Sequence, residues 1–256
     1  MGFLAKTVLY GLVAEAAVRA AHRSPQAATD PKGALFSLAR SEHGDLAAGI
    51  VAAAIGALGL WFVLEAVVNP FRTPGTALGV VSRAGQALGG LGYVALALAG
   101  FHFASGGGEG PSGDALARAF VARGLAHPEG DLGVAAVGVA AAVVGVRQML
   151  MGLSGTCLEA LELSGRPVAF RGLARALAAA GFGTQGALFT LVGARFTQAA
   201  WYHRPAAAAG TAGALELVAR TVLEPRVLLV AAAGLTAYAL YAGVEGACRR
   251  FPPCAT

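Results

Sequence analysis

The sequence is short of charge. Only 13% of its 256 residues are Asp, Glu, Lys or Arg, against roughly 25% in soluble globular proteins, whereas 56% are hydrophobic. The mean hydropathy is +0.64. A soluble domain of this size needs many more charged side chains to cover its surface, so the composition excludes an ordinary water-soluble protein. It predicts an integral membrane protein, with the lipid bilayer as its main partner.

Cysteine and clustered basic residues are scarce as well. The three cysteines, Cys157, Cys248 and Cys254, form no Cys-x-x-Cys pair and have no histidine at zinc-ligand spacing. They indicate neither a disulfide framework nor a metal site. The net charge of +5 is scattered rather than gathered in the stripe that phosphate binding needs, so no nucleic-acid partner is expected. Motifs for a serine nucleophile, a zinc protease or a nucleotide-binding loop are missing too, and we expect no cofactor and no catalytic residues.

Long apolar runs are what the sequence does contain. The clearest covers residues 46–68, where Glu65 is the only charged residue. As a helix it crosses a hydrocarbon core of about 30 Å, and a helix satisfies all its backbone hydrogen bonds internally. Five more segments have similar character: 3–21, 84–104, 132–153, 174–199 and 226–248. The sequence therefore predicts six transmembrane helices.

The first segment is the least apolar of the six. Lys6, Glu15 and Arg19 lie within it, and a charge in the middle of a span costs about 2.5–3.5 kcal/mol. Taken alone, 3–21 could be a weak span, an interfacial helix or a signal peptide. However, it aligns without a gap on residues 182–200. A cleaved signal has no reason to resemble a segment deep in the chain, so we interpret it as a true span.

Internal similarity extends to other segments. Three further matches are Leu98–Phe103 with Leu191–Phe196, Lys32–Leu35 with Ala212–Leu215, and His43–Leu46 with Glu129–Leu132. The period is roughly 85–95 residues, and each unit reads as a span, a polar linker with a short helix, and a second span. We therefore predict an all-α integral membrane protein, with six helices built from three parallel two-helix repeats in a pseudo-threefold bundle. A single domain would cover 1–256, with units at about 2–72, 82–155 and 174–250.

Four short motifs carry a family resemblance: Gly89-Gly90-Leu91-Gly92-Tyr93, Gly181-Phe182-Gly183, and the Gly-Ala-Leu triplets at 33–35 and 213–215. With its repeats, the chain resembles the prokaryotic membrane family catalogued as domain of unknown function 1206, in which a two-span unit occurs three times. The resemblance covers about 2–250. Lys6, Glu15 and the Gly-rich insertion at 105–108 depart from the family pattern. The resemblance implies a bacterial inner membrane, or an organelle membrane of bacterial origin, and it implies no activity.

The distribution of Lys and Arg gives the orientation. Equal numbers lie on the two sides of the predicted spans, but those on the side of the termini sit in shorter and less acidic segments. This density favours cytoplasmic termini.

Six ionisable residues inside or near the spans are the candidate site residues, because an intramembrane charge marks either a site or a structural pair. Glu15, His102 and Arg195 form a layer on the three first helices, toward the side away from the termini. Glu65, Arg147 and Glu245 form a second layer on the three second helices. In one interpretation Arg195 pairs with Glu15, and Arg147 pairs with Glu65 or Glu245, which fixes the helix register. In the other, the layers line a polar path or a small-ligand site.

Two functions remain open at this point. The lack of a catalytic constellation and the small-residue helix faces favour a non-enzymatic structural or accessory protein, a subunit of a larger membrane assembly or a homo-oligomer. The alternative is a transporter or channel for a small solute or ion that uses the intramembrane Glu, Arg and His side chains.

Overall fold

The computed structural model describes residues 2–23, 31–68, 77–159, 161–163, 165–221 and 225–248, and these are helical almost throughout. The long helices are α1 (Gly2–Arg23), α3 (Gly44–Val68), α4 (Ala77–Ala104), α6 (Gly130–Ser154), α7 (Val168–Trp201) and α9 (Pro225–Cys248). The shorter ones are α2 (Pro31–Ala39), α5 (Gly113–Leu125), α8 (Thr211–Thr221) and the 3₁₀ turns η2 (Thr156–Leu158) and η3 (Pro205–Ala207). The predicted repeat boundaries at 72 and 250 lie outside the described residues.

Five of the six predicted spans are helices long and apolar enough to cross a membrane: Gly44–Val68, Gly85–Ala104, Gly130–Ser154, Val168–Trp201 and Leu228–Cys248. Large apolar side chains such as Leu46, Val143 and Leu240 are exposed along them, as expected for surfaces that face lipid. The all-helical prediction is thus confirmed. The first predicted span is the 22-residue helix α1, which is not among the five. The six-span, threefold arrangement remains a prediction.

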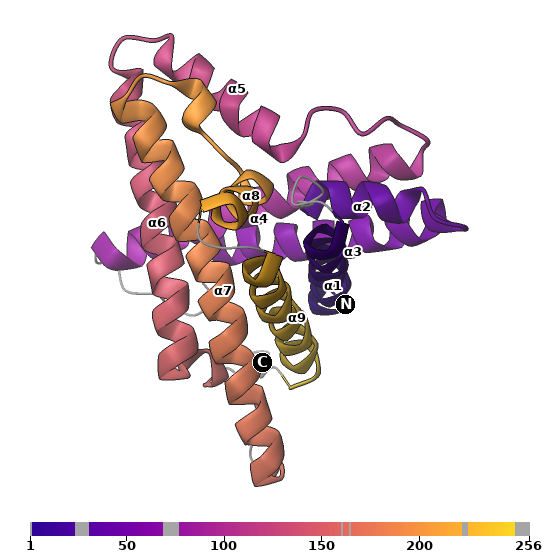
Figure 1. The fold of residues 1–256 in the computed structure, drawn as a ribbon. Coiled ribbons are helices and arrows are strands. Elements are labelled where there is room, and N and C mark those ends of the chain that lie inside the picture. The colour runs from indigo at the N-terminus through magenta and orange to yellow at the C-terminus, as the bar shows by residue number, and fades with distance from the viewer. Residues whose placement is uncertain are drawn as a thin grey trace.

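The long helices pack as three antiparallel pairs: α3 with α4, α6 with α7, and α1 with α9. Each pair joins the second helix of one predicted unit to the first helix of the next, and the pair of α1 and α9 joins the two ends of the chain. Weaker contacts of α7 with α9 and of α1 with α3 connect the pairs. In Figure 1, α6 and α7 run from the top to the bottom of the picture, whereas α3 and α4 run across it.

Glycine residues allow α3 and α4, and likewise α6 and α7, to approach each other closely. A Cβ atom on Gly59 of α3 would lie 2.7 Å from the carbonyl oxygen of Gly90 on α4. Gly145 of α6 and Gly186 of α7 face each other so closely that a Cβ on either would collide with the other's carbonyl oxygen. Backbone approach of this kind supplies the packing that drives helix association in lipid, where no hydrophobic effect operates between helices.

The short linker helices are joined to one another at one end of the pairs. Asp114, in the first turn of α5, accepts hydrogen bonds from the backbone N–H groups of Gly210 (2.6 Å) and Gly213 (3.1 Å) at the start of α8. Lys32 of α2 donates to the carbonyl oxygen of Pro111, just before α5, at 2.5 Å. These long-range bonds hold the three linkers on one side of the molecule.

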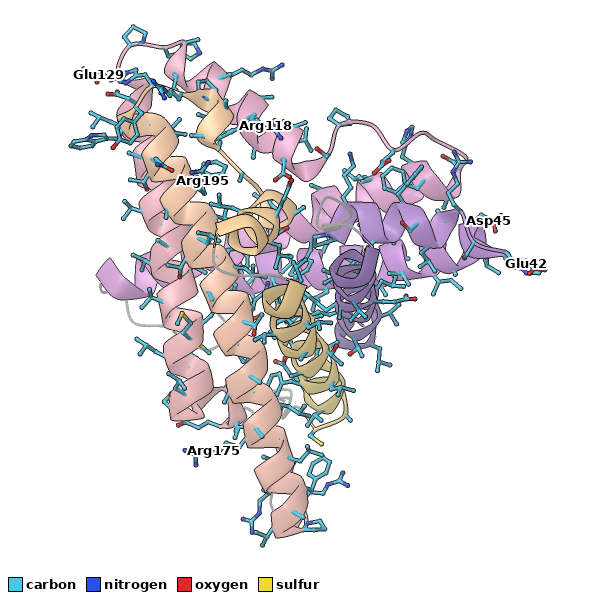
Figure 2. All side chains as sticks on the ribbon, in the orientation of Figure 1. Glu42, Asp45, Arg118, Glu129, Arg175 and Arg195 are labelled. Atoms are coloured by element: carbon cyan, nitrogen blue, oxygen red, sulfur yellow. The ribbon has the colours of Figure 1, made fainter. Side chains whose placement is uncertain are left out.

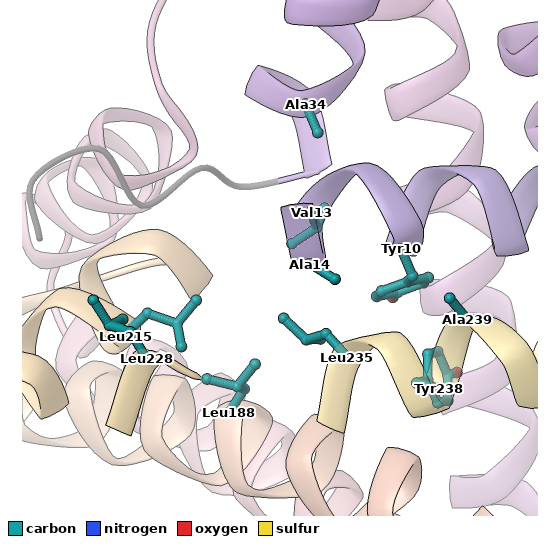
Figure 3. Packing of buried hydrophobic residues seen from close by; sticks show 10 residues of the cluster. All are labelled: Tyr10, Val13, Ala14, Ala34, Leu188, Leu215, Leu228, Leu235, Tyr238 and Ala239. Carbon is teal, nitrogen blue, oxygen red and sulfur yellow. The ribbon is translucent and has the colours of Figure 1, made fainter. Parts of the chain in front are cut away.

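The largest buried cluster lies where α1, α7, α8 and α9 meet (Figure 3). Tyr10 of α1 packs edge-on against Tyr238 of α9, with ring centroids 4.8 Å apart. Leu188 of α7 and Leu235 of α9 belong to the same cluster. The core of the molecule therefore lies around α9, between α1 and α7.

Candidate functional site

A buried polar group lies inside this core. Apart from tyrosine and cysteine, only two polar side chains are buried among those that the structure describes, Lys6 on α1 and Gln185 on α7. In the alignment of 3–21 on 182–200, these two residues occupy the same position. Burying an ammonium or an amide among apolar helices is costly unless partners receive it. The surroundings of the two side chains therefore define the first candidate site.

Aromatic rings receive the Lys6 amine. Its Nζ lies 4.6 Å from the centroid of the Tyr238 ring on α9, and the Tyr238 hydroxyl is within hydrogen-bonding reach. A ring face attracts a cation by its quadrupole, and the attraction reaches about 2 kcal/mol when the pair is shielded from water. The ring of Tyr238 also forms an edge-to-face pair with the ring of Tyr10, which lies one turn along α1 from Lys6. Lys6 thus connects α1 to α9 through the ring of Tyr238.

Gln185 connects a third helix to the group. Its Nε2 donates a hydrogen bond of 2.9 Å to the hydroxyl of Tyr10, and that hydroxyl is also within hydrogen-bonding reach of Tyr93 on α4. Because a phenol can donate and accept at once, Tyr10 joins the amide to the second phenol. Side chains of α1, α4, α7 and α9 therefore meet in one polar cluster, which we call the tyrosine cluster. It contains Lys6, Tyr10, Tyr93, Gln185 and Tyr238, and we include Glu245 because it interacts with them electrostatically.

Glu245 is the sequence-predicted site residue that belongs to this cluster. It is partly buried on α9, one helical turn before the helix ends, and it interacts electrostatically with Lys6, Tyr93 and Tyr238. In the sequence, Lys6 stands out only as a charge that weakens the first span, so it was not among the predicted site residues. The alignment of Lys6 with Gln185, two polar residues at one position in two apolar helices, could have revealed the cluster.

The remaining predicted residues of the second helices lie apart. Arg147 is exposed on α6, and in the described part of the chain α6 has no substantial contact with α3 or α9, the helices of Glu65 and Glu245. On α3, the Oε2 atom of Glu65 is buried without a hydrogen-bond partner. The structure therefore does not gather this layer of charges around one point.

The predicted residues of the first helices are also separate. Glu15 is exposed on α1, and His102 is exposed near the end of α4, where its ring packs against Gly107. Arg195 lies in the upper part of α7 in Figure 2 and donates to Gln198 of its own helix, while its Nε is buried without a partner. The pairing of Arg195 with Glu15 stays a prediction.

A small hollow elsewhere does not extend the site. It lies at the turn between α2 and α3 and the end of α4, and its lining includes Phe36, Arg40, Asp45, Phe103 and Gly107. Asp45 and its neighbour Glu42 stand at the edge of the molecule in Figure 2. No group of three or more metal-ligating side chains occurs among the described residues. The tyrosine cluster is the more deeply buried of the two places.

The cysteines form a separate buried contact. The hydroxyl of Tyr241 on α9 donates to the carbonyl oxygen of Cys157 in η2, at 2.8 Å. Burial raises the pKa of the Cys157 thiol, so the thiol stays protonated at higher pH than a free cysteine. Cys248 is buried in the same apolar cluster, and Cys254 lies outside the described residues. This contact holds η2 against the end of α9.

Comparison with known proteins gives a family. The model of the family described as Domain of Unknown Function (DUF1206) matches residues 1–69 and 180–249, together more than half of the chain. No curated protein and no solved structure matches the chain.

Proposed function

Because the chain belongs to the Domain of Unknown Function (DUF1206) family, whose description names no activity, we propose its function from its geometry. The protein is a multi-pass membrane protein that acts as a structural or accessory subunit of a membrane assembly. It lies in a bacterial inner membrane, with six spans in three repeats and both termini cytoplasmic.

Three observations support the six-span, three-repeat part of the proposal. The helix α1 has 22 residues, which is enough to cross a hydrocarbon core, and it packs along α9. The two segments matched by the family model start at equivalent positions of the first and third units. Equivalent positions of two second helices are buried: Ala48, Ala52 and Gly59 on α3, and Val134, Gly138 and Gly145 on α6.

The exposure of Arg147 supports the proposed role as a subunit of a larger assembly. Only 17% of the apolar stretch of α6 is buried, the lowest share among the candidate spans, and Arg147 lies on its exposed surface seven residues before the helix ends at Ser154. A guanidinium at that depth, about 10 Å along the axis from the helix end, is costly in lipid. A helix of another subunit that covers α6 would remove this cost.

The test is the mass of the native particle. Purified in a mild detergent, the tagged protein is expected in a particle heavier than one chain plus its detergent. Arg147→Leu should reduce that association at least about fivefold, whereas Arg118→Leu, on the exposed surface of the linker helix α5, should leave it unchanged. A monomer that crosslinks to nothing in membranes would contradict the proposal.

The tyrosine cluster favours a second candidate, transport of a small solute or ion. A buried amine inside a membrane protein is a functional-site candidate by default. Lys6 interacts electrostatically with Tyr238 and Glu245 on α9, with Tyr93 on α4 and with Tyr10 on its own helix. Lys6→Met would then abolish a flux of protons, potassium or chloride into proteoliposomes while the protein keeps its thermal midpoint. Lys32→Met, at the only other lysine, is the control. If the unmodified protein, Lys6→Met and Lys32→Met all give the same flux as liposomes without protein, this candidate is wrong.

A further inference from the structure

We propose that the partner that covers α6 is a second copy of this chain, with α6 of one protomer packed against α4 of the other. The inference rests on the proposed function and names its partner. It starts from a contact that the first and third predicted units make and the middle unit does not.

In the first and third units, the two spans of the unit touch. On the α1 and α3 side, Leu9 packs in one buried cluster with Val51 and Ile55. On the α7 and α9 side, Leu188 packs with Leu235, at the positions equivalent to Leu9 and Ile55. The spans of the middle unit, α4 and α6, have no substantial contact within the described residues. The corresponding faces of α4 and α6 are thus left without a partner.

The side chains on these two faces are exposed accordingly. Val137 of α6 takes the position of the buried Val51 but is 44% exposed. Arg147 takes the position of Tyr241, which is 1% exposed on α9. On α4, Leu91 corresponds to Thr184, which packs against Gly234 of α9, yet Leu91 is 54% exposed. Positions that are buried in the first or third unit are thus exposed in the middle unit.

The two open faces fit each other in size. Tyr241 packs against Phe182 of α7, with ring centroids 5.3 Å apart. The position of Phe182 is occupied on α4 by Gly89, and one turn before it stands Gly85; a Cβ atom on either would meet nothing within 4 Å. The large Arg147 of α6 therefore faces a shallow glycine surface on α4 in place of a bulky ring. The α4 face can receive the long side chain that the α6 face presents.

A second copy of the chain can supply a partner for each of these two faces. The chain carries the glycine face and Arg147 together, so two protomers related by a twofold axis make the same contact twice. Within one chain α4 runs across the direction of α6 (Figure 1), and the two helices make no substantial contact in the described part of the chain. The dimer would move two arginines out of lipid.

Disulfide crosslinking between differently tagged copies tests this. Leu91→Cys is placed in one copy and Ala140→Cys in the other, because these positions correspond to the contacting Thr184 and Gly234. Both copies carry serine at the three native cysteines and are co-expressed in membranes. We expect a mixed disulfide at least about tenfold more abundant than with Val139→Cys, which lies at the same depth but about 100° around α6. Gly56→Cys with Ala97→Cys in one chain is the positive control, since a Cβ on Gly56 lies 3.1 Å from that of Ala97.

Two results would overturn the inference. The first is a disulfide that forms only within a chain carrying both Leu91→Cys and Ala140→Cys, which would show that α4 and α6 of one protomer close on each other. The second is no disulfide at either arrangement. If the native particle still contains another polypeptide in that case, the accessory role stands and only the self-association fails. If the native particle contains only one chain, both the accessory role and the self-association are wrong.

Discussion

The helices α9 and α6 are both second spans of their predicted units and have similar apolar sequences, yet their surroundings differ. The apolar stretch of α9 is 56% buried, because α1 lies on one side of it and α7 on the other. That of α6 is 17% buried, because α7 is its only long neighbour among the described residues. Burial here follows from the number of neighbours and is nearly independent of composition.

The difference decides what a polar residue can do on each helix. On α9, Tyr238 receives Lys6 and Tyr241 donates to Cys157, so both phenols have partners inside the protein. On α6, Arg147 is exposed on the surface of the molecule. Positions 241 and 147, which the predicted repeats match, are thus buried in one helix and exposed in the other.

The largest expected effect comes from breaking the single neighbour contact of α6. Gly186→Leu on α7 should destabilise the protein by more than about 4 kcal/mol, because the new side chain collides with the backbone of α6 at Gly145. Gly183→Leu, three residues earlier, should cost little, since a Cβ there meets nothing within 4 Å. Thermal unfolding in detergent measures both. Similar midpoints for the two variants would show that α6 does not depend on this contact.

An intermediate effect compares the two helices directly with one kind of substitution. Leu235→Ala on α9, at 1% exposure, should cost about 2–4 kcal/mol by leaving a cavity between α1, α7 and α9. Leu150→Ala on α6, at 61% exposure, should change stability by less than about 0.5 kcal/mol. The free energy of unfolding in mixed micelles gives both values. A loss for Leu150→Ala as large as that for Leu235→Ala would contradict the difference in burial between the two helices.

The smallest expected effect concerns the pKa of the Cys157 thiol, which is buried near the end of α9. With Cys248 and Cys254 replaced by serine, the pH midpoint for alkylation of Cys157 should be higher in the folded than in the unfolded protein, because burial raises the pKa of this thiol. The unfolded state then loses its proton first, so the contribution of Cys157 to stability falls as pH rises above the unfolded pKa. Alkylation rates between pH 7 and 10 measure the shift. An equal or lower midpoint in the folded protein would contradict it.

The sequence predicted the spans well because hydropathy is a local property. The helices α3, α4, α6, α7 and α9 follow from runs of Ala, Val, Leu and Gly that leave the backbone no hydrogen-bond partners except its own. The family resemblance is confirmed as well, over residues 1–69 and 180–249. The candidate site was predicted less well. Glu245 lies in the tyrosine cluster, but Lys6 and Gln185 were missed, because the cost of a charge in a helix says nothing about the rings that receive it.

The sequence by itself determined that the chain is helical, that most of its helices are long and apolar enough for a bilayer, and that Lys6 and Gln185 stand at matching positions of two helices. These properties depend on residues close together in the chain. Only the tertiary structure decided that Lys6 meets Tyr238, that Gln185 meets Tyr10, and that α9 is enclosed while α6 stays at the edge. The physical reason is that neighbours in lipid are selected by close backbone packing between glycines and by scarce polar partners, and both depend on segments far apart in sequence.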